Sequence, residues 1–274
     1  MNSRASTLRF QVESVLAGRH AHPFQYRDRP IVETVPAGIP AIDNLTGGLP
    51  RGSLTEIYGP PCSGKTSFLV SALASRTAAS EVCALVDARD AFDPHSAETV
   101  GVRLNQLVWV RCRNADQALR ATDLLIQGGG FGLIALDFSD TPPYMVRSVP
   151  LPVWFRFRRA VEDTPTVLLL LDQESNAKSC ASLVLRLRTE EIHWSQTSDT
   201  AERSYLPHSP GLLFDGWKSY AEMIRSGAKQ HESSPLAASF RRDGVDFEMQ
   251  TIWHHSHAAF GRVPAVSKGG RGKR

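Results

Sequence analysis

The stretch Gly59-Pro60-Pro61-Cys62-Ser63-Gly64-Lys65-Thr66 decides the fold. It matches the phosphate-loop pattern G-x-x-x-x-G-K-[ST] at every position. The sequence predicts a strand at Ser53–Tyr58, directly before it, and a helix at Gly64–Ala79, directly after it. Because two glycines let the backbone curl around a phosphate, amide N–H groups at the helix N-terminus face the negative charge. This strand–loop–helix unit therefore predicts a nucleoside triphosphate site, with a chance glycine loop as the disfavoured alternative.

The side chains of this loop have distinct expected roles. Lys65 is expected to reach the β- and γ-phosphates, and the Thr66 hydroxyl to hold Mg²⁺. Cys62 is interpreted as a small residue that fills the loop. The residues expected to contact the nucleotide are Gly59, Pro60, Pro61, Cys62, Ser63, Gly64, Lys65, Thr66 and Ser67.

A carboxylate for the metal ion is expected at the end of a neighbouring apolar strand. Leu133–Phe138 is such a strand, and Asp137 lies near its end. Asp137 is expected to orient Mg²⁺, directly or through water. Two alternatives stay open: Asp137 is an ordinary aspartate at a strand end, or Asp87, at the end of another strand, takes the role.

Short apolar strands alternate with helices along the middle of the chain. Beyond the loop, strands are predicted at Val82–Asp87, Leu107–Arg111, Leu133–Phe138 and Val167–Asp172, and helices at Pro94–Val100, Ala115–Gln127 and Val153–Glu162. This alternation indicates an α/β fold with a mainly parallel sheet flanked by helices. Ser182–Arg188 and Asp246–Trp253 are predicted to add antiparallel strands at one sheet edge, and Thr197–Pro210 and Gly227–Pro235 to be loops.

Composition and charge set further bounds on the 274-residue chain. With 42% hydrophobic and 22% charged residues it has an ordinary globular balance, and no apolar run approaches a membrane span or signal peptide, so we expect a cytoplasmic protein with four reduced cysteines. The expected division is an N-terminal extension at 1–35 with a helix at Thr7–Leu16, a core at 36–195, edge strands and loops at 196–254, and a disordered tail at 255–274.

The predicted tail is basic. It has no acidic residue and five lysines and arginines: Arg262, Lys268, Arg271, Lys273 and Arg274. Such a Gly-rich cationic segment suits the phosphates of a nucleic acid or an acidic partner. A tail that only aids solubility is the alternative.

Several motifs outside the loop resemble the core of the bacterial RecA recombinase family. They are Pro36–Asp43, Gly47–Gly52, Glu56–Pro60, Val86–Pro94 with Val100–Val102, and Asp116–Leu119 before the Asp137 strand. They occur in the family's order from about Val35 to Arg188. The resemblance implies a RecA-like ATPase core that binds ATP and Mg²⁺, acts in DNA repair and recombination within the SOS response, binds single-stranded DNA and assembles with copies of itself.

The resemblance also implies roles for single residues. Gln173 matches the glutamine that senses the γ-phosphate and relays it to a DNA-binding loop, which adds it to Lys65 and Asp137 as a catalytic candidate. Asp93 matches a residue near the adenine. Asn176 and Ala181-Ser182 resemble the segment after the second DNA loop.

Three departures from the family weaken the expectation of fast ATP hydrolysis. Arg89 stands where the family has the catalytic glutamate, and arginine accepts no proton at neutral pH. Ser96 replaces the tyrosine that stacks on adenine. Both DNA-binding loops are short, at Ser139–Pro150 and Glu174–Ser175.

These departures favour a paralogue over the main recombinase. The chain is also similar to the RecA-like ImuA accessory proteins of translesion synthesis, so RecA or a translesion polymerase is a possible partner. The leading functional hypothesis is a weak ATPase that assembles under nucleotide control. The alternatives are a competent DNA-dependent ATPase and a non-catalytic adaptor. Arg147 and the segment Trp154–Arg159 are interpreted as a helix with aromatic core residues and solvated arginines, or as a rim that faces DNA or a partner.

Overall fold

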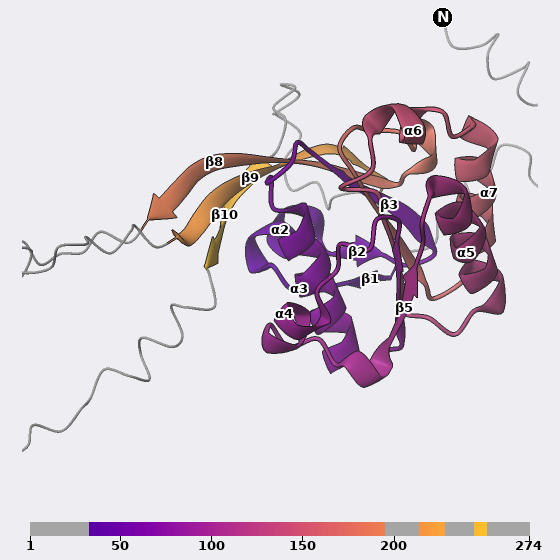
Figure 1. The fold of residues 1–274 in the computed structure, drawn as a ribbon, viewed down its shortest axis with the longest axis horizontal. Coiled ribbons are helices and arrows are strands. Elements are labelled where there is room, and N and C mark those ends of the chain that lie inside the picture. The colour runs from indigo at the N-terminus through magenta and orange to yellow at the C-terminus, as the bar shows by residue number, and fades with distance from the viewer. Residues whose placement is uncertain (1–32, 195–213, 228–243, 251–274) are drawn as a thin grey trace, which may run out of the picture. The chain divides into compact units, whose positions relative to one another are not determined.

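The computed structural model describes residues 33–194, 214–227 and 244–250 (Figure 1). The predicted helix Thr7–Leu16, the loop Thr197–Pro210, nearly all of the loop at 227–235 and the basic tail lie outside the described residues. The proposed division of the chain at residues 35, 195 and 254 stays a prediction. Within the described ranges, no helix combines the length and apolar character that crossing a membrane requires.

The helices and strands alternate along the core. The helical elements are α2 (Pro40–Thr46), α3 (Lys65–Ala78), α4 (Pro94–Thr99), η1 (Leu104–Gln106), α5 (Ala115–Gly128), α6 (Pro143–Arg147), α7 (Leu151–Val161) and η2 (Lys178–Cys180). The strands are β1 (Thr34–Val35), β2 (Leu49–Pro50), β3 (Ser53–Tyr58), β4 (Cys83–Asp87), β5 (Leu107–Arg111), β6 (Leu133–Asp137), β7 (Val167–Asp172), β8 (Leu183–Trp194), β9 (Phe214–Ser226) and β10 (Gly244–Gln250).

The main sheet is mixed but mostly parallel. Its strand order is β10-β9-β8-β3-β7-β6-β4-β5. Every neighbouring pair from β8 to β5 is parallel, and β9 and β10 extend the β8 edge in antiparallel fashion. The predicted α/β class with added antiparallel edge strands is therefore confirmed. One detail differs: the predicted strand Ser182–Arg188 continues to Trp194 and pairs in parallel with β3, so antiparallel pairing begins only at β9.

Two apolar clusters cover the two faces of the sheet. In β7, Val167, Leu169 and Leu171 face the cluster that α2, α3 and α4 complete, whereas Leu168 and Leu170 face the cluster of α5, α6 and α7. Figure 1 shows the two groups of helices on opposite sides. Because both faces are buried, the parallel strands are apolar at consecutive positions.

The α7 helix places its aromatic residues in the second cluster. Trp154 and Phe157 are 1% and 0% exposed, and their rings meet edge to face at 6.1 Å. Arg156, Arg158 and Arg159 are exposed on the same helix. The predicted core position of Trp154 and Phe157 is confirmed, whereas the exposed arginines fit both a solvated face and a rim that faces DNA or a partner.

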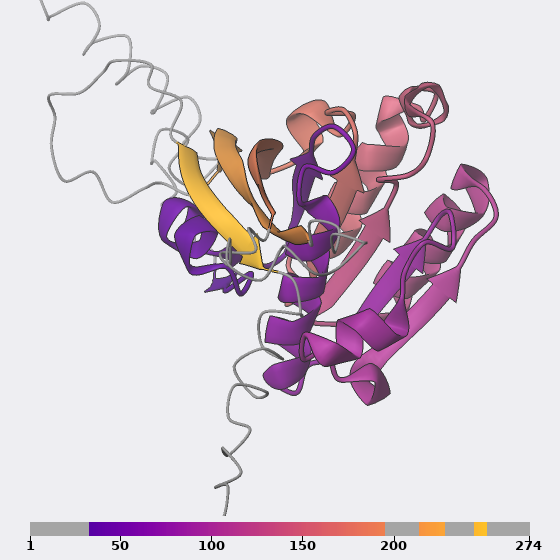
Figure 2. The same cartoon turned by 60° about the vertical axis from the view of Figure 1, so that its left-hand side comes forward.

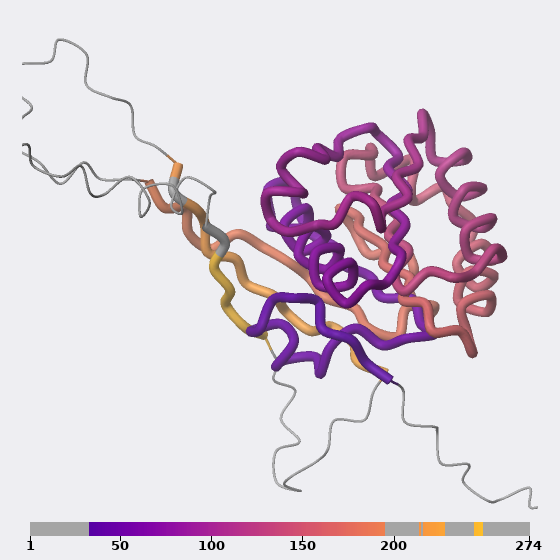
Figure 3. Tube along the Cα trace, turned by 90° about the horizontal axis from the view of Figure 1, so that it is seen from below, coloured from indigo at the N-terminus to yellow at the C-terminus, as the bar shows by residue number. Residues whose placement is uncertain are grey.

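The β9 strand has no counterpart in the sequence prediction. Its inward positions include Ser219 and Ala221, both fully buried, so the strand lacks the alternating large apolar residues that reveal a half-buried strand. Together, β9 and β10 lie beside α2, although 168 residues separate Thr46 from Phe214 (Figures 2 and 3). This packing brings the distal strands next to the phosphate loop.

Candidate nucleotide-binding site

The phosphate loop joins β3 to α3 at the carboxyl edge of the sheet. Gly64 has φ of 94°, a left-handed conformation that favours glycine, and it caps α3. A Cβ at Gly59 would lie 2.2 Å from the backbone oxygen of Leu187. Both glycines are therefore required, one by conformation and one by space. They shape a loop whose amides and helix N-terminus suit a phosphate.

Lys65 lies beneath this loop with only 4% exposure. Its Nζ donates hydrogen bonds to the backbone oxygens of Gly59 at 2.6 Å and Pro60 at 2.7 Å. Burial lowers the pKa of the Lys65 ammonium, while Asp137, Asp140 and Asp172 oppose that shift. The cation is thus held inside the loop with acidic groups close by, which is the placement that phosphate binding requires.

Asp137 occupies the position expected of the metal-side acid. It ends β6, in register with Asp87 at the end of β4. Its Oδ1 accepts the backbone N–H of Ser139 at 2.8 Å. Burial raises the pKa of the Asp137 carboxyl, the hydrogen bonds from Ser139 oppose this, and nearby Asp87 and Asp140 add to it. A partly buried carboxylate beside other acids gains from a cation at this point.

Asp87, the alternative metal-side acid, has a structural task. Its Oδ1 accepts the backbone N–H of Arg89 at 3.1 Å, and its Oδ2 accepts that of Phe92 at 2.9 Å. The Trp109 indole N–H also donates to Oδ2, at 3.4 Å. These bonds fix the turn after β4, so both of its oxygens are engaged and Asp137 is the better candidate.

The loop and its neighbours provide suitable donors for Mg²⁺ beside a triphosphate. Thr66 is exposed on the first turn of α3 and lines the cavity over the loop. Magnesium takes oxygen ligands and usually keeps one or two protein groups plus phosphates and water. A hydroxyl at Thr66 and a carboxylate at Asp137 fit this preference, and the glycine cradle leaves room for the phosphates.

Gln173 connects the two loops that follow β6 and β7. Its Nε2 donates to the backbone oxygens of Ser139 at 2.9 Å and Thr141 at 3.2 Å. Ser139 lines the cavity over the phosphate loop. Gln173 therefore adjoins the candidate site through Ser139 and joins the cavity wall to the start of the loop after β7.

A buried glutamate, not anticipated from the sequence, holds that second loop. Glu56 lies in β3 with 0% exposure. It accepts hydrogen bonds from the Ser175 hydroxyl at 2.7 Å and from the backbone N–H groups of Asn176 at 2.7 Å and Ala177 at 2.8 Å. Burial raises the pKa of Glu56, against these hydrogen bonds. The available sequence signal was a charged residue between Leu54 and Ile57, two apolar residues of a predicted strand.

The segment after β4 contains two of the departures, Arg89 and Ser96. Arg89 is exposed there. Asp90 pairs with Arg111, which lowers the pKa of the Asp90 carboxyl. Asp93 caps α4, where its side chain accepts the backbone N–H groups of His95 and Ser96 at 3.2 Å. The carboxylates of this turn are thus committed to an ion pair and a helix cap.

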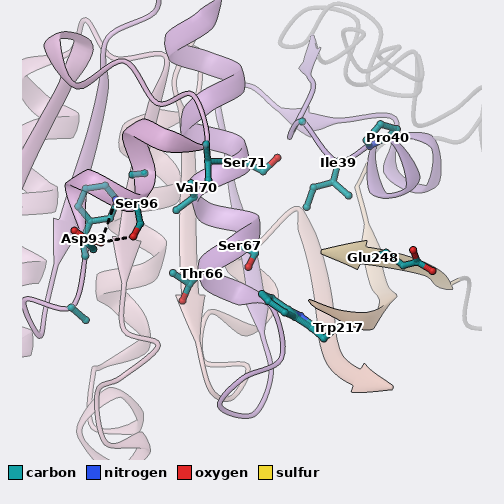
Figure 4. A pocket seen from close by; sticks show the side chains of 15 residues that line it. Ile39, Pro40, Thr66, Ser67, Val70, Ser71, Asp93, Ser96, Trp217 and Glu248 are labelled. Atoms are coloured by element: carbon teal, nitrogen blue, oxygen red, sulfur yellow. Dashed lines mark hydrogen bonds between the residues drawn. The ribbon is translucent and has the colours of Figure 1, made fainter. Parts of the chain in front are cut away.

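Two cavities meet at the first turn of α3. One, of about 700 Å³, lies over the phosphate loop and includes Lys65 and Asp140. The other, of about 500 Å³, lies beside α3 and includes Asp93. They share Thr66, Ser67 and Trp217. Figure 4 shows the second cavity around α3, with Asp93 just before α4, Ser96 within α4, Trp217 from β9 and Glu248 from β10.

A parallel α/β sheet with this loop, lysine and acid is the arrangement typical of P-loop nucleotide-binding proteins. The family model of the RecA N-terminal domain matches residues 20–141, so this segment of the chain is similar to the RecA family. Lys65, Thr66, Asp93 and Asp137 lie inside the matched segment, whereas Gln173 lies beyond it.

Individual relatives agree with the family model. "Protein RecA" of Streptomyces ambofaciens is 39% identical over 113 residues, which cover 40% of this chain and 30% of the relative. "Protein RecA" of Streptomyces avermitilis is 40% identical over 108 residues, or 39% of this chain and 29% of the relative. "Protein RecA" of Cutibacterium acnes is 40% identical over 108 residues, or 39% and 31%. The chain thus spans about a third of the length of the curated relatives it matches.

Proposed function

We propose that this protein is a RecA-like, ATP-binding DNA repair and recombination protein. Bound Mg·ATP controls its assembly on single-stranded DNA or on a repair partner, and it hydrolyses ATP slowly. The observation that carries the proposal is Lys65, buried under an intact phosphate loop and close to Asp137. A buried ammonium inside a glycine-rich loop is suited to binding a polyphosphate.

Each residue of the site has a task in this proposal. Backbone amides of the phosphate loop and Lys65 bind the phosphates, and Thr66 and Asp137 hold Mg²⁺. The ion neutralises charge on the bound phosphates. Gln173 positions the cavity wall through the backbone oxygen of Ser139. Slow turnover follows from Arg89, because an arginine cannot take a proton from the attacking water.

Coupling between nucleotide and assembly uses the loops after β6 and β7. Gln173 ties them together, and the side chains of Arg147 and Glu174 add an ion pair at 2.8 Å between Arg147 Nε and Glu174 Oε2. Exposed Tyr144 and Lys178 lie on the same two segments. A nucleotide that moves Ser139 therefore moves a surface able to contact DNA or protein.

A second candidate function is a non-catalytic accessory role in translesion synthesis, of the ImuA type. The pairing of Asp90 with Arg111 favours it, because that pairing removes the nearest substitute for the missing glutamate beside Arg89. In this role the protein binds RecA or a translesion polymerase during the SOS response. The nucleotide then stabilises the fold and no turnover is required.

Assembly measurements separate these functions. Light scattering and anisotropy of labelled single-stranded DNA are recorded with and without Mg·ATP, for wild type, Lys65→Ala and the exposed control Arg120→Ala. The proposal expects ATP-dependent assembly in wild type and Arg120→Ala, and none in Lys65→Ala. If all three proteins assemble equally with and without Mg·ATP, nucleotide control is contradicted. ATP turnover in the same samples distinguishes a slow ATPase from an adaptor.

A further inference from the structure

The second cavity has the character of a site for a flat, uncharged ring. Its lining includes the apolar side chains of Ile39, Val70 and Ala97, whereas the cavity over the phosphate loop contains Lys65. A nucleoside triphosphate has two parts that match the two cavities: an aromatic base for the more apolar one and a polyanion for the one with Lys65. Since the cavities join at Thr66 and Ser67, one ligand can occupy both.

One wall of this cavity cannot stack on a base. The Ser96 hydroxyl donates to Asp93, and no ring stands there. Phe92 lines the cavity, but its ring already packs edge to face on Trp109, with centroids 5.5 Å apart. Trp217, from β9, also lines this cavity, at its junction with the cavity over the phosphate loop (Figure 4).

Phe214 and the phosphate loop both contact the Trp217 side chain. Phe214 stacks against it with centroids 5.7 Å apart and planes 17° apart. Its Nε1 would lie 3.4 Å from a Cβ at Gly64, so the indole abuts the phosphate loop. That Nε1 is buried and has no hydrogen-bond partner within the described residues. A buried indole N–H without a partner is costly, and a polar atom of a ligand would relieve the cost.

We propose that Trp217 is the residue that contacts the nucleoside of the bound nucleotide, replacing the stacking ring missing at Ser96. The inference rests on the proposed ATP site and assigns its base-binding half to β9, which lies outside the matched family segment. The indole contacts the nucleoside from the junction of the two cavities. The phosphates stay on the phosphate loop.

A comparison of two ligands distinguishes binding of the base from binding of the phosphates. Titration calorimetry compares Mg·ATP with Mg·tripolyphosphate, which lacks a nucleoside. Trp217→Ala is expected to weaken ATP at least about fivefold and to leave tripolyphosphate within about twofold, since aromatic stacking on a base contributes this much. Trp217→Phe keeps a ring and retains most of the ATP affinity. Phe155→Ala, an exposed aromatic control on α7, changes neither ligand.

Other outcomes overturn the inference. If Trp217→Ala binds ATP as wild type does, or loses both ligands equally, Trp217 does not contact the nucleoside. If Trp194→Ala weakens ATP more than Trp217→Ala does, the base lies over the phosphate loop. If Trp217→Ala fails to fold, the indole fluorescence change on adding ATP decides: loss of the change in Trp217→Phe but not in Trp194→Phe supports the inference, and the reverse result overturns it. Failure of the ATP site itself shows separately, as unchanged affinity for both ligands in Lys65→Ala.

Discussion

Removal of the Glu56 carboxylate tests how the loop after β7 is held. Glu56→Ala leaves the backbone N–H groups of Asn176 and Ala177 without their acceptor, together with the Ser175 hydroxyl. A buried donor that loses its partner costs about 1–3 kcal/mol. Two amides therefore cost about 2–6 kcal/mol. Glu56→Ala also removes the cost of burying the carboxylate, the same burial that raises the pKa of Glu56. This gain offsets part of the cost of the two unpaired amides. We expect a net loss of about 2–5 kcal/mol in the free energy of unfolding.

The matched control is Glu56→Gln. Its carbonyl oxygen still accepts both amides, and its NH₂ group donates to the Ser175 hydroxyl, which reverses the direction of that bond. The expected cost is below about 1.5 kcal/mol, one neutral hydrogen bond. Urea denaturation followed by far-UV circular dichroism measures both variants. If Glu56→Ala stays within about 1 kcal/mol of wild type, or Glu56→Gln costs as much as Glu56→Ala, the reasoning is refuted.

Two further predictions concern acidity and turnover. Burial raises the pKa of Asp172 from 3.8 to about 6. Between these pH values the folded protein therefore keeps a proton on Asp172 that the unfolded chain releases. The free energy of unfolding falls as pH rises through this window. Asp172→Asn should therefore gain stability over wild type from pH 4 to 7, by up to about 3 kcal/mol in urea titrations, and a pH-independent difference would contradict this assignment. Arg89→Glu should raise steady-state ATP hydrolysis, by up to about 10²–10⁴-fold for a working general base. A brisk wild-type ATPase that Arg89→Glu abolishes would instead give Arg89 a positive role.

The sequence predicted the parallel core well because its signals are local. The β3, β5 and β7 strands have the predicted bounds. For β5 and β7 the signal is an apolar run that ends at a turn or loop, and for β3 it is the phosphate loop that follows directly. The phosphate loop and Asp137 follow from such strand ends. These features need only the residues next to them in sequence.

The parts that sequence reasoning missed depend on distant packing. The β9 strand places small Ser219 against the phosphate loop, where its hydroxyl donates to the backbone oxygen of Ser63 at 3.3 Å, and small polar residues give no strand signal. Trp217 becomes part of the site only through the same packing. The engagement of Asp87 and Asp93 in local hydrogen bonds could not be read from their positions at strand and helix ends.

Affinity for Mg·ATP in wild type and Lys65→Ala tests the central claim most directly. Titration with a fluorescent ATP analogue is suitable, with exposed Arg120→Ala as the matched control for the loss of a cation. Loss of the buried ammonium that the phosphate loop encloses should weaken binding at least tenfold, or about 1.4 kcal/mol, and Arg120→Ala should bind as wild type does. Equal affinity in wild type and Lys65→Ala, or no binding by wild type, would contradict the assignment of this loop as the nucleotide site.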